Sequence, residues 1–140
     1  MTATVRIVTL VENTAAGPDV LAEHGLSFWL DSSDGRLLFD TGQGRVLFTN
    51  ALKLGVHLEH TDAIVLSHGH YDHTGGLGDA LRSSLRPPVF AHRDATPRPA
   101  GRVPIGHAGV ADGARFVDVL SGAEFVVAGG ALSLPELPQG

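Results

Sequence analysis

The sequence predicts an α/β fold, and two stretches of the chain support this prediction. Residues 62–67 form a short apolar run rich in branched side chains, which is typical of a buried strand. A histidine-rich loop follows, and then residues 78–82 read as a short helix that ends before Pro87-Pro88. A strand that leads through a loop into a helix is the repeating unit of α/β sheets, which bind ligands beyond the carboxyl ends of their strands.

The other elements follow the same logic along the chain. Asp34-Gly35 is a strong hairpin signal between two alternating strands. Apolar spacing over residues 44–54 predicts a helix closed by Gly55. We expect residues 93–109, rich in proline and glycine, to form an irregular loop. The remaining strands are expected at 4–10, 26–31, 36–40, 64–67 and 89–91, with a second hairpin from 115–120 and 124–127.

The loop after the central strand carries four metal-ligand side chains within six positions: His68, His70, Asp72 and His73. Imidazole nitrogen and carboxylate oxygen are the donors that zinc prefers. In extended backbone His68 and His70 project to the same side, so one ion can bind both, whereas the adjacent Asp72 and His73 suit a second ion. Two such ions can hold a hydroxide between them for hydrolysis. The simpler alternative is a solvated histidine-rich loop.

The four residues match the His-x-His-x-Asp-His signature of the metallo-β-lactamase superfamily, which this chain resembles. The apolar run ending in Asp40-Thr41-Gly42 resembles a second element of that family, whose aspartate supports the metal loop from behind. Several segments narrow the resemblance to the branch of the dihydropterin–ribofuranosylaminobenzene phosphate synthases, many of whose members are described only as metallo-hydrolases. These segments are residues 24–27, 39–43, 50–51, 54–56, 67–77 and 88–92.

The resemblance implies half of a known fold. Members of the superfamily are usually a four-layer αββα sandwich of two similar halves, and the second half supplies further ligands. Residues 129–138 are similar to the segment that joins the halves. We therefore expect residues 1–140 to be a single half-domain, a mixed β-sheet with helices on one face, produced by truncation, frameshift or division into two chains.

Three functions stay open under this resemblance. The first is a metallo-hydrolase with a dinuclear zinc centre, in which Asp72 also orients the nucleophile. The second is a group-transfer synthase that condenses a dihydropterin with a phosphorylated aromatic riboside. The third is a catalytically incomplete metal-binding half-domain that forms a homodimer or needs a complementary second half. Iron or manganese are alternatives to zinc.

Three further histidines are candidates for substrate or metal contact. The resemblance places His24 and His92 near the rim of the pocket. His107 lies in Gly-His-Ala-Gly, which resembles the Ser-His-Ala-Gly that carries a third metal-site histidine in complete members, although an alignment of this stretch with a linker is preferred. His57 and His60 precede a strand, and we expect them to be solvated.

Composition limits the function classes. The chain has 140 residues, 43% of them hydrophobic, with no apolar run near the roughly 18 residues of a membrane span and no signal-peptide pattern. Cysteine is absent, which excludes disulfides and thiolate ligands and suggests a cytoplasmic location. The net charge of −5 argues against a nucleic-acid partner. A small anionic substrate remains compatible, because bound cations reverse the local charge.

Overall fold

A computed structural model describes residues 4–92, 95, 102–104, 112–118, 124–128 and 131–133. Four short helical segments lie among these residues: α1 (Leu47–Lys53), the 3₁₀ turn η1 (Leu58–His60), α2 (Tyr71–Thr74) and α3 (Leu77–Ser83). The strands are β1 (Arg6–Val11), β2 (Ser27–Ser32), β3 (Gly35–Phe39), β4 (Ala63–Leu66), β5 (Val89–Ala91), β6 (Arg102–Pro104), β7 (Arg115–Asp118), β8 (Glu124–Ala128) and β9 (Ala131–Ser133). No helix in these ranges is both long and apolar enough to cross a membrane.

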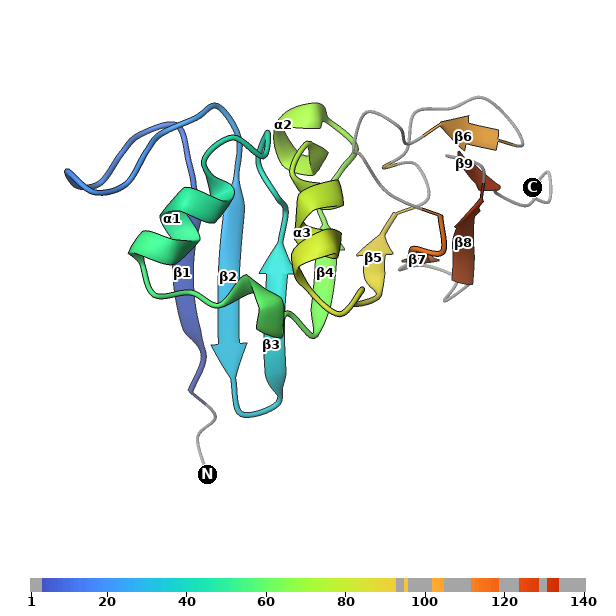
Figure 1. The fold of residues 1–140 in the computed structure, drawn as a ribbon, viewed down its shortest axis with the longest axis horizontal. Coiled ribbons are helices and arrows are strands. Elements are labelled where there is room, and N and C mark those ends of the chain that lie inside the picture. The colour runs from blue at the N-terminus through green and yellow to red at the C-terminus, as the bar shows by residue number, and fades with distance from the viewer. Residues whose placement is uncertain are drawn as a thin grey trace.

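The described strands form one mixed sheet in the order β1-β2-β3-β4-β5-β7-β8-β9-β6 (Figure 1). Strands β1, β2 and β3 are antiparallel, and β3, β4, β5 and β7 are parallel to one another. The connections between the parallel strands carry α1 and α3. Because parallel strands end at one edge of a sheet, the residues that follow β3, β4 and β5 meet there.

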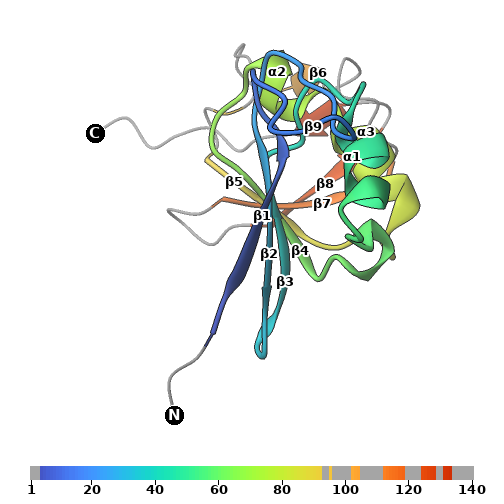
Figure 2. The same cartoon turned by 90° about the vertical axis from the view of Figure 1, so that its left-hand side faces the viewer.

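The helices cover one face of the sheet (Figure 2). One register row crosses this face from strand to strand, and its side chains are all buried: Trp29, Leu38, Ile64, Val89 and Phe116. Burial of a large apolar side chain stabilises the folded state by about 1.5–3 kcal/mol. This row, together with the apolar residues of α1 and α3, is therefore the core that holds β4 and its following loop in place.

The opposite face of the sheet is also apolar. One register row on it runs through Phe28, Phe39, Val65, Phe90 and Val117, all half-buried. At the two margins of this face, Ile7 is 62% exposed and Val126 is 55% exposed. No helix within the described ranges packs on this side.

The predicted α/β class, the mixed sheet and the helices on one face are confirmed. The first hairpin, with its turn at Asp34-Gly35, and the β4–loop–α3 unit form as expected, and the helix expected at 44–54 is shorter, Leu47–Lys53. The prediction of an irregular loop over 93–109 was wrong at Arg102–Pro104, which forms β6 and pairs with β9. That strand depends on a partner about 30 residues away, so local composition gave no sign of it. Residues 119 and 120 of the second hairpin lie outside the described residues.

Candidate metal centre

Strands β3 and β4 bring the two sequence motifs together. They are parallel neighbours, so Asp40, which follows β3, lies beside Ser67, which follows β4. The backbone of Asp40 has a φ of 54°, in the left-handed region that aspartate tolerates better than most residues. Its amide donates to the carbonyl of Val65 at 2.8 Å, which fixes this turn to β4. The strand ends therefore aim a carboxylate at the histidine loop.

Asp40 is completely buried, and its carboxylate accepts three hydrogen bonds. Oδ1 accepts from the Ser67 amide at 2.8 Å, and Oδ2 accepts from the Ser67 hydroxyl at 2.6 Å and from Nδ1 of His73 at 2.7 Å. A buried carboxylate is tolerated only when its oxygens are paired in this way. Asp40 thus lies behind the histidine loop and holds it, as the sequence motif suggests.

These hydrogen bonds determine which ring nitrogens are available. A carboxylate only accepts hydrogen bonds, so Nδ1 of His73 must carry a proton and donate the hydrogen bond to Asp40. The Ser67 hydroxyl has one proton and donates it in the hydrogen bond to Asp40. Its contact with Nδ1 of His68, at 2.8 Å, is therefore one in which the hydroxyl oxygen accepts from the ring. In the neutral state both histidines therefore keep an unprotonated Nε2, which is the form that binds a metal ion.

The rings of the histidine loop lie close together. The His68 centroid is 4.7 Å from that of His70 and 4.1 Å from that of His73. Oδ2 of Asp72 lies 3.5 Å from Nε2 of His73, and both side chains are largely buried, at 14% and 17% exposure. The structure thus brings all four motif residues into one cluster.

This donor chemistry fits a zinc-type ion, although the cluster is not a closed cage. Within the described ranges, no group of three or more His, Cys, Asp or Glu side chains is placed so that it could hold a metal ion.

His24 also reaches the loop, from the segment that precedes β2. Its Nε2 lies 3.2 Å from Oδ2 of Asp72, and its ring is 72% exposed. His92 follows β5 at the same edge of the sheet and is half-buried. His107 lies outside the described residues.

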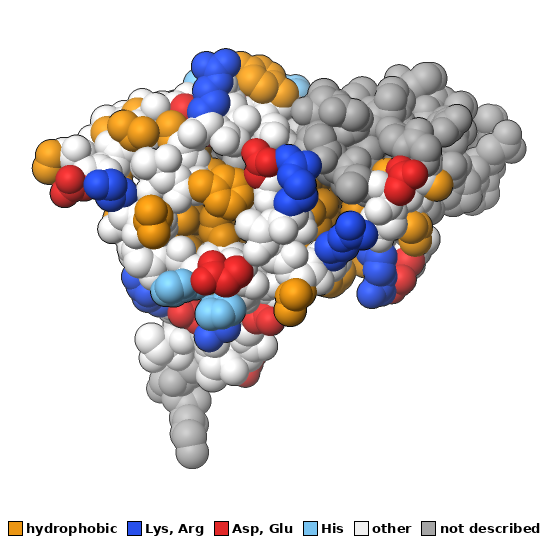
Figure 3. Space-filling model, viewed as in Figure 1, with side chains coloured by type: hydrophobic (Ala, Val, Ile, Leu, Met, Phe, Trp, Pro, Cys, Tyr) orange, Lys and Arg blue, Asp and Glu red, His pale blue; other side chains and the backbone are white. Residues whose placement is uncertain are grey.

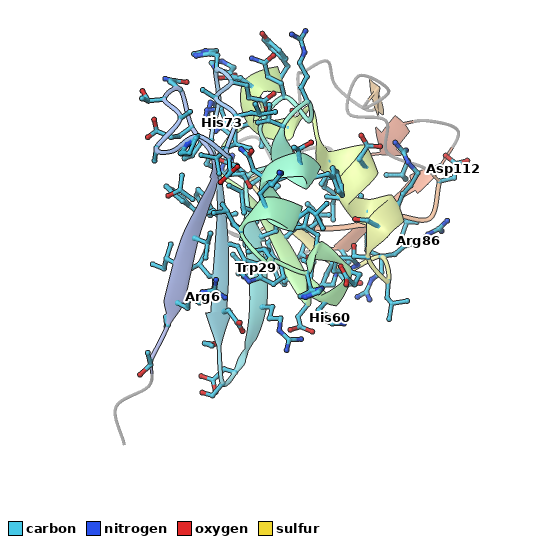
Figure 4. The ribbon with its side chains drawn as sticks, turned by 60° about the vertical axis from the view of Figure 1, so that its left-hand side comes forward. Arg6, Trp29, His60, His73, Arg86 and Asp112 are labelled. Carbon is cyan, nitrogen blue, oxygen red and sulfur yellow. The ribbon has the colours of Figure 1, made fainter. Side chains whose placement is uncertain are left out.

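The other two histidines lie elsewhere. Figure 4 shows His60 at the opposite end of the sheet from His73. The ring centroids of His57 and His60 are 5.7 Å apart. Nδ1 of His57 is 2.9 Å from the carboxylate of Glu59, and the His57 side chain is 69% exposed. A hydrogen bond from its own backbone N–H, and one from the His57 ring, hold the pKa of Glu59 below its ordinary value. The expected exposure of His57 is confirmed.

Two contributions to the site were not foreseen from the sequence. Ser67 links Asp40 to His68, and Thr41 donates to the carbonyl of His73 through its amide at 2.7 Å and its hydroxyl at 3.0 Å. Both residues directly adjoin motif positions, so Ser-His and Asp-Thr were the available signals.

A hollow of about 150 Å³ lies away from the loop, between α3 and the start of β7, and is lined by Gly78, Leu81, Arg82, Ser84, Arg86 and Ala114.

Comparisons with known proteins agree with these motifs. The profile of the metallo-beta-lactamase superfamily matches residues 21–138. Uncharacterized protein MJ0448 of Methanocaldococcus jannaschii is 42% identical over 90 residues, covering 64% of this chain and 35% of that protein. The 7,8-dihydropterin-6-methyl-4-(beta-D-ribofuranosyl)-aminobenzene-5'-phosphate synthase of the same organism is 37% identical over 95 residues, covering 63% and 32%.

A solved structure, that of Rm3 metallo-beta-lactamase, has a TM-score of 0.45 and 34% sequence identity, covering 50% of this chain and 27% of that one. The chain spans about a third of the length of the two archaeal relatives it matches.

Proposed function

Because the chain belongs to the metallo-beta-lactamase superfamily, we propose that it carries one half of the dinuclear metal centre of a metallo-hydrolase. The observation that supports this most is the hydrogen-bond network around buried Asp40, which binds His73 directly and His68 through Ser67. It orients two imidazoles with Nε2 free, and the other two motif residues lie beside them. A solvated loop has no need of a completely buried carboxylate behind it.

In this proposal His68 and His70 hold the first ion, and Asp72 and His73 hold the second. A bound zinc, iron or manganese ion supplies Lewis-acid activation of water near neutral pH. The Asp72 carboxylate orients the nucleophile. Asp40 keeps the Nδ1–H groups of His73 and, through Ser67, of His68 directed away from the ions. A small anionic substrate suits a site where cations offset the negative charge of the chain.

The expectation that nucleic acid is not a partner stays a prediction, and Figure 3 shows how the charged side chains lie on one face. On the helix-covered face the lysine and arginine side chains are dispersed among acidic and apolar ones, without a continuous basic patch in the described part. Nucleic-acid interfaces normally gather their basic residues on one surface. The far face is not visible in this view.

The test is metal content together with hydrolysis. Purified protein should contain transition metal by elemental analysis and should hydrolyse generic phosphodiester or lactone substrates, and His68→Ala should lose both metal and activity. His60→Ala, at the opposite end of the sheet, is the matched control and should keep both. Metal-free protein, or a His68→Ala variant with full metal content, would contradict the proposal.

Group transfer is the second candidate, and the synthase relative supports it. The same residues would then position a dihydropterin and a phosphorylated aromatic riboside for condensation. Incubation with both compounds separates the alternatives, because a condensed product indicates transfer, whereas loss of a lactone or phosphodiester without condensation indicates hydrolysis.

A third candidate is a half-domain that is completed by self-association. It is favoured by the apolar sheet face that carries no helix in the described ranges, and by the two ligands available to each ion. A second copy packed on this face would bury the row of Phe28, Phe39, Val65 and Phe90. Light scattering should then report a dimer, and a monomer with a cooperative melt would count strongly against this candidate.

A further inference from the structure

We propose that Glu23 is a positioning residue of the candidate metal centre, whose carboxylate holds the turn that presents Asp40 to the histidine loop. For its effect on zinc binding, this inference rests on the proposed function. Glu23 lies in the connection between β1 and β2, outside the two sequence motifs. It would therefore control the site from a third part of the chain.

The turn after β3 has a backbone that its surroundings must impose. Asp40 has a φ of 54°, and Gly42 and Gly44 have φ values of 60° and 90°. A residue other than glycine in the left-handed region is strained, and it persists only where neighbouring contacts hold it there. The turn determines where the Asp40 carboxylate points. The contacts that hold the turn therefore also hold the acceptor of Ser67 and His73.

Four consecutive amides of this turn, from Asp40 to Gln43, each donate a hydrogen bond. The first three donate to backbone carbonyls in β4, in the histidine loop and in the segment before β2, at 2.8, 2.7 and 3.0 Å. The fourth amide, that of Gln43, donates to Oε1 of Glu23 at 2.9 Å. Among these four acceptors Glu23 is the side chain, so a substitution there removes one constraint on the turn and leaves the other three.

The Glu23 carboxylate lies directly against the turn. A Cβ at Gly42 would lie 2.6 Å from Oε1 of Glu23, so a side chain at this position would displace the carboxylate. The other oxygen, Oε2, is buried and has no hydrogen-bond partner in the part of the chain that the structure describes. An unpaired buried oxygen costs free energy, and a surface glutamate would avoid that cost by turning both oxygens to water. The side chain is thus held at the turn.

The simpler alternative is that Glu23 contributes to folding in general and has no particular effect on the site. The two roles differ in what happens in protein that is still folded. A positioning residue alters the hydrogen bond between His73 and Asp40 when it is removed, whereas a general contribution leaves that bond unchanged. Glutamine can present the same acceptor oxygen to the Gln43 amide, so it should restore a positioning role.

The experiment compares metal-free wild type with Glu23→Ala and Glu23→Gln, with Glu12→Ala as the matched control. Glu12 is an exposed glutamate just after β1, and its Oε1 accepts from the Thr14 amide at 2.7 Å. The first readout is the proton NMR signal of Nδ1–H of His73, identified as the signal that disappears in His73→Ala. We expect Glu23→Ala to shift or lose this signal, and Glu23→Gln and Glu12→Ala to keep it at its wild-type position.

The second readout is calorimetric titration of Zn²⁺ into the same proteins. We expect binding about 10-fold weaker in Glu23→Ala, as for residues that orient metal ligands from behind, and wild-type affinity in Glu23→Gln and Glu12→Ala. Thermal melts establish that each variant is folded under the conditions of measurement. If Glu23→Ala does not fold, Glu23→Gln decides the matter, because a wild-type His73 signal supports the proposal and its loss contradicts it.

The outcomes separate this inference from the proposed function. An unchanged His73 signal in folded Glu23→Ala would overturn the role of Glu23, and so would a shifted signal with unchanged zinc affinity. A Glu23→Gln variant that behaves like Glu23→Ala would also overturn it, because the negative charge and not the hydrogen bond to Gln43 would then matter. If wild type binds no Zn²⁺, the proposed function fails, whereas the His73 signal still tests whether Glu23 holds the Asp40 turn.

Discussion

Two histidine–carboxylate pairs at opposite ends of the sheet have similar contact distances but differ in how exposed their side chains are. Nδ1 of His73 lies 2.7 Å from Asp40, and Nδ1 of His57 lies 2.9 Å from Glu59. Asp40 is fully buried and His73 is 17% exposed, whereas Glu59 and His57 are 56% and 69% exposed. The comparison shows that the surroundings of a histidine, and not the contact alone, separate an organised site from a solvated surface.

The largest effect is expected from Asp40→Ala. It removes the fully buried carboxylate that accepts from the Ser67 amide and hydroxyl and from Nδ1 of His73, and broken buried networks cost about 3–5 kcal/mol. Urea denaturation of metal-free protein measures the loss. A change below about 1 kcal/mol would mean that the buried pair resembles the exposed one, and the contrast would disappear.

His73→Ala should have a smaller effect on folding. Asp40 keeps its two hydrogen bonds from Ser67 and loses one, so we expect a destabilisation of about 1–3 kcal/mol in metal-free protein. The same denaturation assay reports it, and His57→Ala serves as the control with no more than a few tenths of a kcal/mol. Equal effects in the two variants would contradict the comparison.

Ser67→Ala probes the link from Asp40 to His68. It removes one hydroxyl that donates to Asp40 and accepts from Nδ1 of His68, and we expect a cost of about 1 kcal/mol. Zn²⁺ titration should show weaker binding as well, by about 10-fold, because His68 loses the partner that fixes its tautomer. Unchanged zinc affinity would show that this partner does not orient the ring.

Glu59→Gln should have the smallest effect. The pKa of Glu59 is lowered by its own backbone N–H and by His57, so its ionised form favours the folded state. A lowered pKa stabilises the protein above the ordinary carboxyl pKa, and this contribution is lost as the pH falls through the folded value. The melting temperatures of Glu59→Gln and wild type should differ only slightly at pH 7, and the difference should vanish as the pH falls from 4.5 through the lowered pKa of Glu59. A large gap at pH 7 would mean that the exposed pair matters.

Sequence reasoning identified the elements whose signals are local. The strand at β4, the hairpin at Asp34-Gly35 and the helix α3 each follow from a short stretch of residues. The proximity of Asp40 to the histidine loop followed from family resemblance, and the parallel pairing of β3 and β4 explains it physically. In each case the information lies within a few residues or in one recognisable motif.

The features that were missed have two causes, one local and one that lies in contacts between distant residues. The short helix α2 (Tyr71–Thr74) lies inside the histidine run, where ligand residues obscure any helical pattern. The pairing of β6 with β9 joins parts of the chain far apart in sequence, and so does the approach of His24 to Asp72, which only the family resemblance anticipated. Periodicity and turn residues carry no information about such contacts, which only the assembled sheet creates.

The most direct test of the central claim is the number of transition-metal ions bound per chain in purified wild type and in His73→Ala. The account predicts at least one ion per wild-type chain, two where the dinuclear centre is assembled, and the loss of one ion in His73→Ala. Wild-type protein that binds no Zn²⁺ even when titrated, or a His73→Ala variant that binds as much as wild type, would contradict it.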